Sequence, residues 1–136
     1  MSIMDNAKLF FDACETGKGW DGCKDYCKAG ASFSCQADAL ADVSTVEAYC
    51  EWMKGLFAPV PDGNYELKAM SLDDERNVVT AFAVFHGTHT VDGPVPATNK
   101  TVAGDYVYAI FFDGDKISHL TKIWNDVHSL RQLGWA

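Results

Sequence analysis

The chain has 136 residues, of which 48% are hydrophobic and 22% are charged, so intrinsic disorder is excluded and a single domain over residues 1–136 is expected. Eleven basic against nineteen acidic residues leave a formal net charge of −8, which disfavours nucleic acid and anionic membranes as partners. No apolar run reaches the ~18 residues of a membrane helix and no signal-peptide pattern is present, so we expect a cytoplasmic protein.

The N-terminal part of the chain is predicted to form helices. Over residues 5–16, apolar residues recur at helical spacing and form one stripe: Ala7, Phe10, Phe11 and Cys14. Gly17 can end this helix. A second, short helix is expected over residues 20–29, because apolar residues share one face there and Gly30 follows.

The third predicted helix has the clearest start. Ser44-Thr45-Val46-Glu47 is typical of a capping box, in which Ser44 caps the first turn and Glu47 reaches back to it. An apolar stripe follows as far as Phe57. Pro59 and Gly63 then end the helix.

After Gly63 the apolar period changes to that of strands. Four strands are expected, over residues 65–72, 78–90, 101–112 and 116–124, followed by a short helix over residues 127–133. The turns between the strands are too short for helical crossovers, so the sheet is antiparallel. Helices followed by hairpins predict an α+β fold, in which a curved sheet covered by helices forms a cone with a hydrophobic pocket for a small apolar ligand.

The five cysteines are an odd number, and without an export signal we expect free thiols in the core. Cys23 and Cys27 are four residues apart, which would suit a metal pair. No histidine lies near them at zinc spacing, since all four follow residue 85. A nucleotide-binding loop and a nucleophile elbow are also missing, so no metal and no cofactor are expected.

Several motifs in the second half resemble the SnoaL-like polyketide cyclases, within the nuclear transport factor 2-like superfamily. They are Gly87-Thr88-His89-Thr90, the loop from Gly93 to Lys100, Asp113-Gly114-Asp115-Lys116-Ile117 and Leu130-Arg131-Gln132-Leu133-Gly134. The resemblance implies a cystatin-like α+β cone, a curved antiparallel sheet wrapped around N-terminal helices. It also implies a homodimer formed through the sheet, and cyclase or isomerase activity.

The resemblance further implies an acid/base aspartate nine residues before Gly134 and eight after Ile117. Both counts lead to Asn125, an amide that cannot carry a proton. Asp126 follows at once and has two interpretations. It is either a substitute acid/base residue, on the other face of a regular strand, or the N-cap of the last helix.

His119 is the second candidate for acid/base catalysis. By strand alternation it shares a face with Ile117, Thr121 and Asn125, and histidine is the side chain best suited to moving protons near neutral pH. If this face lines the cone, His119 and Asn125 hold two ends of one ligand. Otherwise His119 is a half-buried residue bonded to its neighbours.

Aromatic residues from helices and strands are candidates for the wall of a pocket that binds an apolar or aromatic ring, although some must be core. The candidate pocket residues are Asn125, Tyr106, Tyr108, Thr121, Trp20, Phe33, Trp52, Phe57, Phe85 and His89. Tyr106 and Tyr108 could steady an enolate oxygen. His89 also has a structural interpretation, as a residue that holds the neighbouring loop.

Three functions remain open on these residues. The first is an enzyme that moves a proton next to a carbonyl of an apolar ring substrate, with His119 or Asp126 as base. The second is a non-catalytic ligand-binding domain, which Asn125 favours. The third is a protein-interaction domain with a filled cone.

Overall fold

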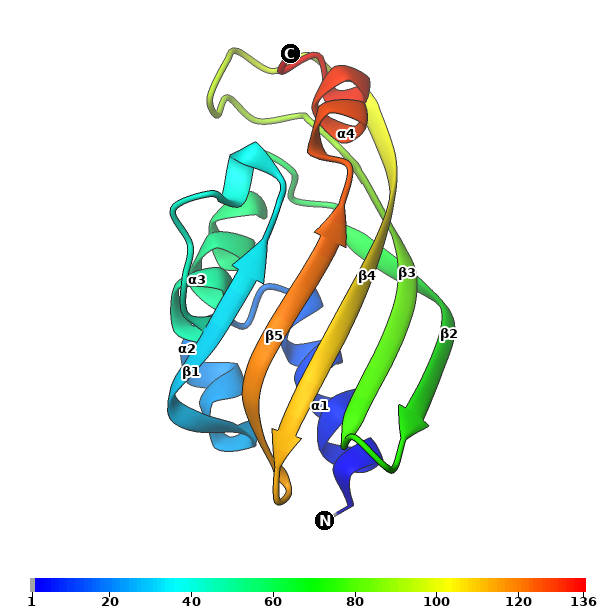
Figure 1. Cartoon of the computed structure of the whole chain (residues 1–136). Coiled ribbons are helices and arrows are strands. Elements are labelled where there is room, and N and C mark those ends of the chain that lie inside the picture. Colours follow the sequence, from blue (N-terminus) through cyan, green and yellow to red (C-terminus); the bar gives the residue numbers. More distant parts are fainter. Residues whose placement is uncertain (1) are drawn as a thin grey trace.

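The computed structural model describes residues 2–136, and its centre is one five-stranded sheet that curves without closing (Figure 1). The strands are β1 (Cys27–Cys35), β2 (Asn64–Asp73), β3 (Val78–Thr88), β4 (Thr101–Asp113) and β5 (Lys116–Trp124). Their order in the sheet is β1-β5-β4-β3-β2. All neighbours are antiparallel except β1 and β5, which are parallel.

Helices cover one face of this sheet and one end of it. They are α1 (Ile3–Glu15), α2 (Gly19–Cys23), α3 (Val46–Leu56) and α4 (Asp126–Leu133), with short 3-10 turns at η1 (Lys24–Tyr26) and η2 (Asp38–Leu40). Figure 1 shows α1, α2 and α3 behind the sheet, and α4 beyond the end of β5, close to the C-terminus. The predicted α+β class is confirmed. Among residues 2–136, no helix has the length and apolarity needed to cross a bilayer.

Most predicted elements are present, with two corrections in the first half. The helix predicted over residues 20–29 is wrong beyond Cys23, because residues 27–35 form the edge strand β1. Its Gly30 has a φ of 75°, beside a register shift in the pairing with β5. This conformation suits glycine and fits an irregular edge strand better than a helix end.

The start of α3 is the second correction. Thr45, not Ser44, is the N-cap, since its side chain accepts a hydrogen bond from the amide of Ala48 at 3.1 Å. The backbone carbonyl of Ser44 instead accepts from the amide of Phe33 in β1. A tertiary contact therefore moves the cap by one residue.

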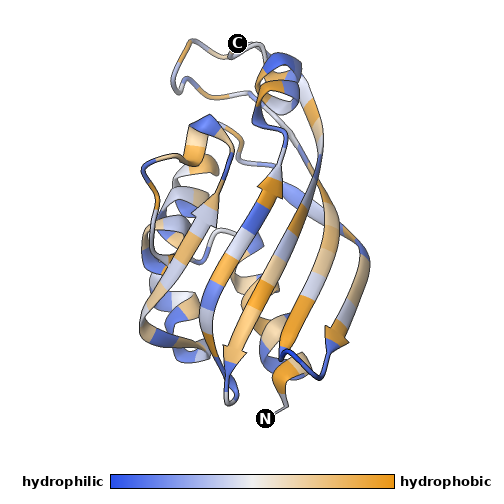
Figure 2. Ribbon diagram, in the orientation of Figure 1, coloured by the Kyte–Doolittle hydropathy of each residue, from blue (hydrophilic) through white to orange (hydrophobic). Residues whose placement is uncertain are grey.

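The core lies between the helices and the inner face of the sheet. The alternating positions predicted for β3 and β4 are buried there, and the stripe of α1 packs against them (Figure 2 shows the hydropathy along the ribbon). The fully buried aromatic side chains include Phe10, Phe11, Tyr49 and Tyr108. The opposite, outer face of the sheet carries exposed apolar residues: Phe82, Phe111 and Ile123.

A β-bulge in β5 decides which of its side chains face the core. Phe111 pairs with His119 and Phe112 with Ile117, so Ser118 is an extra residue. An extra residue reverses the alternation beyond it. Ile117, Leu120 and Lys122 are therefore buried, whereas His119 lies on the outer face. The prediction that His119 shares a face with Ile117 is wrong for this reason.

Candidate functional site

The candidate site is a pocket between the inner face of the sheet, α3 and α4. Its cavity volume is about 60 Å³. Its lining is mostly apolar and comprises Trp52, Met53, Leu56, Val60, Phe85, Val102, Gly104, Tyr106, Trp124, Leu130, Leu133 and Trp135. The polar exceptions are Glu15, Lys122 and Ser129. An apolar pocket with few polar groups is the usual form of a small-molecule site.

Glu15 is the last residue of α1 and is only 1% exposed. Its Oε2 accepts a hydrogen bond of 2.6 Å from the hydroxyl of Tyr108, which lies 2.5 Å from the hydroxyl of Tyr49. Its other oxygen, Oε1, has no partner in the protein. Burial raises the pKa of Glu15, while Lys122 and the tyrosine hydroxyls act in the opposite direction. Glu15 is thus a carboxyl group biased toward its protonated form, with one free oxygen.

Lys122 projects from β5 into a group of aromatic rings. Its Nζ lies 4.4 Å from the ring centroid of Trp124, 5.1 Å from that of Tyr49, 5.3 Å from that of Tyr106 and 5.4 Å from that of Trp52. The residue is 6% exposed, and none of the ion pairs among residues 2–136 involves it. Burial lowers the pKa of Lys122, against the attraction of Glu15. The ring faces replace part of the hydration that the ammonium form loses.

Tyr106 adds a phenol hydroxyl to the polar groups of this site. Its hydroxyl is buried and makes no hydrogen bond of good geometry, although it lies near enough to the carboxyl group of Glu15 to lower the pKa of that group. Burial, together with the nearby charge of Glu15, raises the pKa of Tyr106, so the phenol stays protonated. Buried polar atoms are almost always hydrogen-bonded in proteins. The free atoms of Glu15 and Tyr106 are therefore places where the polar atoms of a ligand, or water, would bind.

Trp124 and Trp135 shape this pocket through hydrogen bonds. The indole nitrogen of Trp124 donates to the hydroxyl of Ser129 at 3.0 Å. The indole nitrogen of Trp135 donates to Nδ1 of His89 at 2.9 Å. Nδ1 of His89 also accepts from the amide of Thr98 at 3.2 Å. His89 therefore ties the loop and the C-terminal tryptophan together, in agreement with its structural interpretation.

The predicted pocket residues divide into several groups. Trp52, Phe85 and Tyr106 line the pocket, and Tyr108 lies behind Glu15. The remaining aromatic candidates pack within or against the core: Trp20, Phe33 and Phe57. Phe33, for example, stacks on Tyr49 with ring centroids 4.5 Å apart. These contacts serve packing and help to place the hydroxyl of Tyr49.

A second, more open groove at the ends of β1 and β5 contains Thr121, Asn125 and Asp126, and it shares Lys122 and Trp124 with the apolar pocket. Asn125 is the N-cap of α4, since its Oδ1 accepts from the amide of His128 at 3.2 Å. The N-cap interpretation of Asp126 is wrong by one residue. Asp126 accepts instead from the amide of Ala39 at 2.9 Å, which ties α4 to η2. Neither side chain lines the apolar pocket.

His119 lies on the outer face of the sheet, where all its ring nitrogens have partners. Nδ1 is 2.6 Å from the hydroxyl of Ser32, and Nε2 is 2.9 Å from that of Thr121 and 3.2 Å from that of Ser34. The apolar pocket lies on the other face. Neither His119 nor Asp126 lines that pocket, and their catalytic roles stay predictions.

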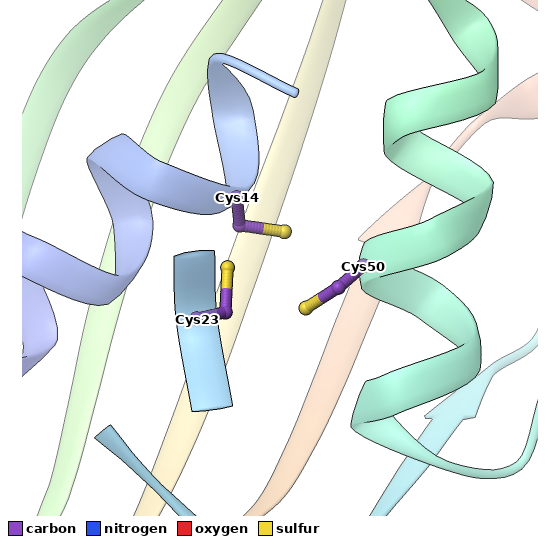
Figure 3. A group of neighbouring side chains, drawn as sticks. All are labelled: Cys14, Cys23 and Cys50. Carbon is purple, nitrogen blue, oxygen red and sulfur yellow. The ribbon is translucent and has the colours of Figure 1, made fainter. Parts of the chain in front are cut away.

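Cys14, Cys23 and Cys50 are the group among residues 2–136 whose side chains could jointly hold a metal ion. Their sulfur atoms point toward one another, as Figure 3 shows. These atoms all lie within 4.8 Å of one another. All three are fully buried members of the hydrophobic core. We assign them to the core, as the sequence predicts, because buried cysteine behaves as a small apolar side chain.

Glu15 and Lys122 were not predicted as site residues, although the sequence around each of them contains a signal. Glu15 follows Phe11 by one helical turn and so continues the apolar stripe of α1. Lys122 lies between Leu120 and Trp124 at alternate positions of a strand. A charged residue on an otherwise apolar face is rare unless it is paired or functional.

The family model of SnoaL-like polyketide cyclase matches residues 5–133 of this chain. The chain belongs to the SnoaL-like polyketide cyclase family. A comparison with curated proteins gave no match. For a SnoaL-like protein the fold described above is the expected one, and the resemblance carried by the motifs after Gly87 is confirmed.

Solved structures share the fold of this SnoaL-like chain. IdmH from Streptomyces antibioticus, described as a candidate polyketide cyclase, superposes with a TM-score of 0.79 at 16% identity, covering 98% of this chain and 99% of that one. A candidate SnoaL-like polyketide cyclase from Jannaschia sp. CCS1 gives 0.78 at 14% identity, covering 98% and 92%. A candidate isomerase from Bacillus subtilis gives 0.75 at 13% identity, covering 100% and 98%. Likeness at these identities establishes the fold alone.

Proposed function

We propose that this SnoaL-like domain binds a small apolar carbonyl compound and moves a proton at the carbon next to the carbonyl, as a cyclase or isomerase. The observation that carries the proposal is Oε1 of Glu15, a buried carboxyl oxygen without a partner at an apolar pocket. Among the residues that line this pocket, Glu15 is the one suited to accept a proton from carbon near neutral pH.

Glu15 has the surroundings of a general base. Burial raises its pKa, which brings a carboxylate closer to the basicity that proton abstraction needs. The hydrogen bond from Tyr108 to Oε2 holds the carboxyl plane and leaves Oε1 for the substrate. The apolar walls exclude water, which strengthens the electrostatic interactions inside the pocket.

Lys122 and Tyr106 complete the proposed site. Abstraction of a proton next to a carbonyl places negative charge on the carbonyl oxygen. Donors held in position before the reaction stabilise such an oxyanion more strongly than water does. The free hydroxyl of Tyr106 and the amine of Lys122 can donate to this oxygen. We therefore assign the base to Glu15 and the oxyanion donors to Tyr106 and Lys122.

The test is hydrogen exchange of a probe ketone. Tetralone, a bicyclic aryl ketone, is incubated with the protein in heavy water, and loss of its protons next to the carbonyl is followed by NMR. The wild-type domain should accelerate exchange, and Glu15→Gln should lower the rate at least ~100-fold. Glu47→Gln, at an exposed site on α3, is the matched control and should exchange like the wild type. Equal rates in wild type and Glu15→Gln would contradict the proposal.

A non-catalytic ligand-binding domain is the second candidate function. Asn125 favours it, because the family resemblance implies a carboxylate at this position and the amide here caps α4. Quenching of the fluorescence of Trp52, Trp124 and Trp135, which line the pocket, reports tetralone binding. Binding without any proton exchange would favour this second function.

The homodimer stays a prediction. The exposed Phe82, Phe111 and Ile123 on the outer face of the sheet are what a dimer formed through the sheet would cover. Sedimentation equilibrium tests it: a monomer at all concentrations would contradict it. A cytoplasmic location likewise stays a prediction.

A further inference from the structure

We propose that the side-chain amine of Lys122 captures the carbonyl ligand covalently, as a Schiff base. The proposal rests on the proposed function, because it takes the same pocket and the same class of ligand. The Schiff base adds to the proposed function, because it gives Lys122 the role of a nucleophile and restricts the substrates to aldehydes and ketones.

Lys122 is placed where its amine can reach a ligand in the pocket. The bulge at Ser118 turns this side chain to the inner face of the sheet, where it lines the pocket and is 6% exposed. Other lysines have exposed polar partners: Lys24, Lys28 and Lys68 form ion pairs with carboxylates at the surface. The four rings around Nζ of Lys122 hold the amine without bonding to its lone pair.

The groups around Lys122 determine whether its amine is neutral or charged. An amine attacks a carbonyl only in its neutral form, and enclosure in an apolar pocket favours that form. Burial lowers the pKa of Lys122. The groups that oppose this shift are Glu15 and Cys14 on α1, Cys35 on β1, and the faces of the four rings. The tyrosines that face it from α3 and β4, Tyr49 and Tyr106, stay neutral because burial raises the pKa of both phenols.

The reaction needs no reagent beyond the ligand. The lone pair of Nζ forms a bond to the carbonyl carbon, and a proton passes from nitrogen to the former carbonyl oxygen, giving a carbinolamine. The carbon–oxygen bond then breaks as the nitrogen lone pair forms the C=N bond. The oxygen leaves as water after it takes a proton from the Glu15 carboxylic acid. One carbonyl compound and one amine thus give one iminium ion and one water, and Glu15 is left as the carboxylate.

The same surroundings suit the product. The iminium nitrogen carries a positive charge beside the faces of the four rings, which favours a cation at this place. The carboxylate of Glu15 now faces a carbon whose protons the iminium has made acidic. Abstraction of one of them gives an enamine, so Schiff-base formation would serve the proton transfer of the proposed function.

The experiment traps the Schiff base with a mild hydride donor. The protein is incubated with tetralone and sodium cyanoborohydride, and intact mass and peptide mapping follow the product. Hydride addition to the C=N carbon leaves a secondary amine, so the expected mass gain is one tetralone minus one oxygen atom. We expect Lys122 to be labelled at least ten times faster than any other lysine. Its labelling rate should level off at a lower pH than theirs.

Matched variants locate the reaction. Lys122→Arg keeps a cation but removes the nucleophile, and should lose the fast labelling. Lys54→Arg, at an exposed site on α3, should keep it. If Lys122→Arg does not fold, a competition experiment on the wild-type protein takes the place of this variant. Tetralin, the hydrocarbon without the carbonyl, should then slow labelling of Lys122 and leave the exposed lysines unchanged.

The outcomes separate this inference from the proposed function. Tetralone that binds and exchanges protons, with no preferential labelling of Lys122, overturns the Schiff base and leaves the proton-transfer proposal standing. Fast labelling of Lys122 without proton exchange supports the Schiff base and contradicts the proton-transfer proposal. Tetralone that neither binds nor labels Lys122 overturns both.

Discussion

The polar groups on the two sides of β5 differ in whether the protein gives them hydrogen-bond partners. On the outer face, both ring nitrogens of His119 have hydroxyl partners at 2.6 to 3.2 Å. On the inner face, Glu15 keeps one oxygen without a partner, and Lys122 is surrounded by ring faces. A protein tolerates free buried polar atoms at a cost in stability. The difference supports the proposal that a ligand binds at the inner face.

The largest expected effect is on the rate of proton exchange, in which variants on the two faces can be compared directly. Glu15→Gln should lower proton exchange of tetralone at least ~100-fold, because an amide cannot accept the proton. His119→Gln should stay within about twofold of the wild type, because His119 does not contact the pocket. The NMR exchange rate measures both. The opposite ranking would return the catalytic role to His119.

Stability should change with opposite sign on the two faces. The double variant Glu15→Gln, Lys122→Met removes two buried ionisable groups together, and should unfold with a free energy about 1–4 kcal/mol higher than the wild type. His119→Ala loses hydroxyl contacts and should be less stable by about 1 kcal/mol. Urea denaturation followed by circular dichroism measures both. A double variant less stable than His119→Ala would contradict the comparison.

The pH dependence of stability isolates Glu15. Its pKa is raised by burial, so its favourable contribution is complete below the pKa of the unfolded chain, whose ordinary value is 4.5, and is lost as the pH rises through the folded value. The unfolding free energy of the wild type minus that of Glu15→Gln should therefore fall as the pH rises above 4.5. Denaturation curves over this range test the sign. A difference that grows with pH would mean that the carboxylate form is the stabilised one.

The smallest effect on proton exchange is expected at Asp126. Asp126→Ala loses the bond to the amide of Ala39 and should destabilise the domain by about 1–2 kcal/mol, while proton exchange stays unchanged. Asp126→Asn keeps an acceptor and serves as its control. Thermal melting and the exchange assay measure the two properties. Loss of exchange in Asp126→Asn would show that the groove at the ends of β1 and β5 takes part in the reaction.

The sequence alone determined most of the architecture. Period-2 patterning predicted four strands, the longest within two residues of their observed ends, and the stripe of α1 is buried as expected. The motifs after Gly87 predicted the family, which the match over residues 5–133 confirms. These features follow from local spacing, because helices and strands present their side chains with fixed periods. Of the site, the same reasoning predicted Trp52 and Phe85 as wall residues, and Tyr106 as a wall residue whose hydroxyl could steady an enolate oxygen.

Only the tertiary structure decided which polar groups meet at the pocket. Because of the bulge at Ser118, Lys122 and not His119 lies on the inner face of the sheet. The pairing of β5 with β4 sets the position of that bulge. β1 is a strand because β5 offers it an edge, and the hydroxyl of Tyr108 on β4 meets the carboxyl group of Glu15 at the end of α1. Each of these depends on residues far apart in the chain. A local pattern describes how side chains alternate along one segment, whereas the insertion of one residue in a ladder, and the contacts between layers, are properties of the assembled fold.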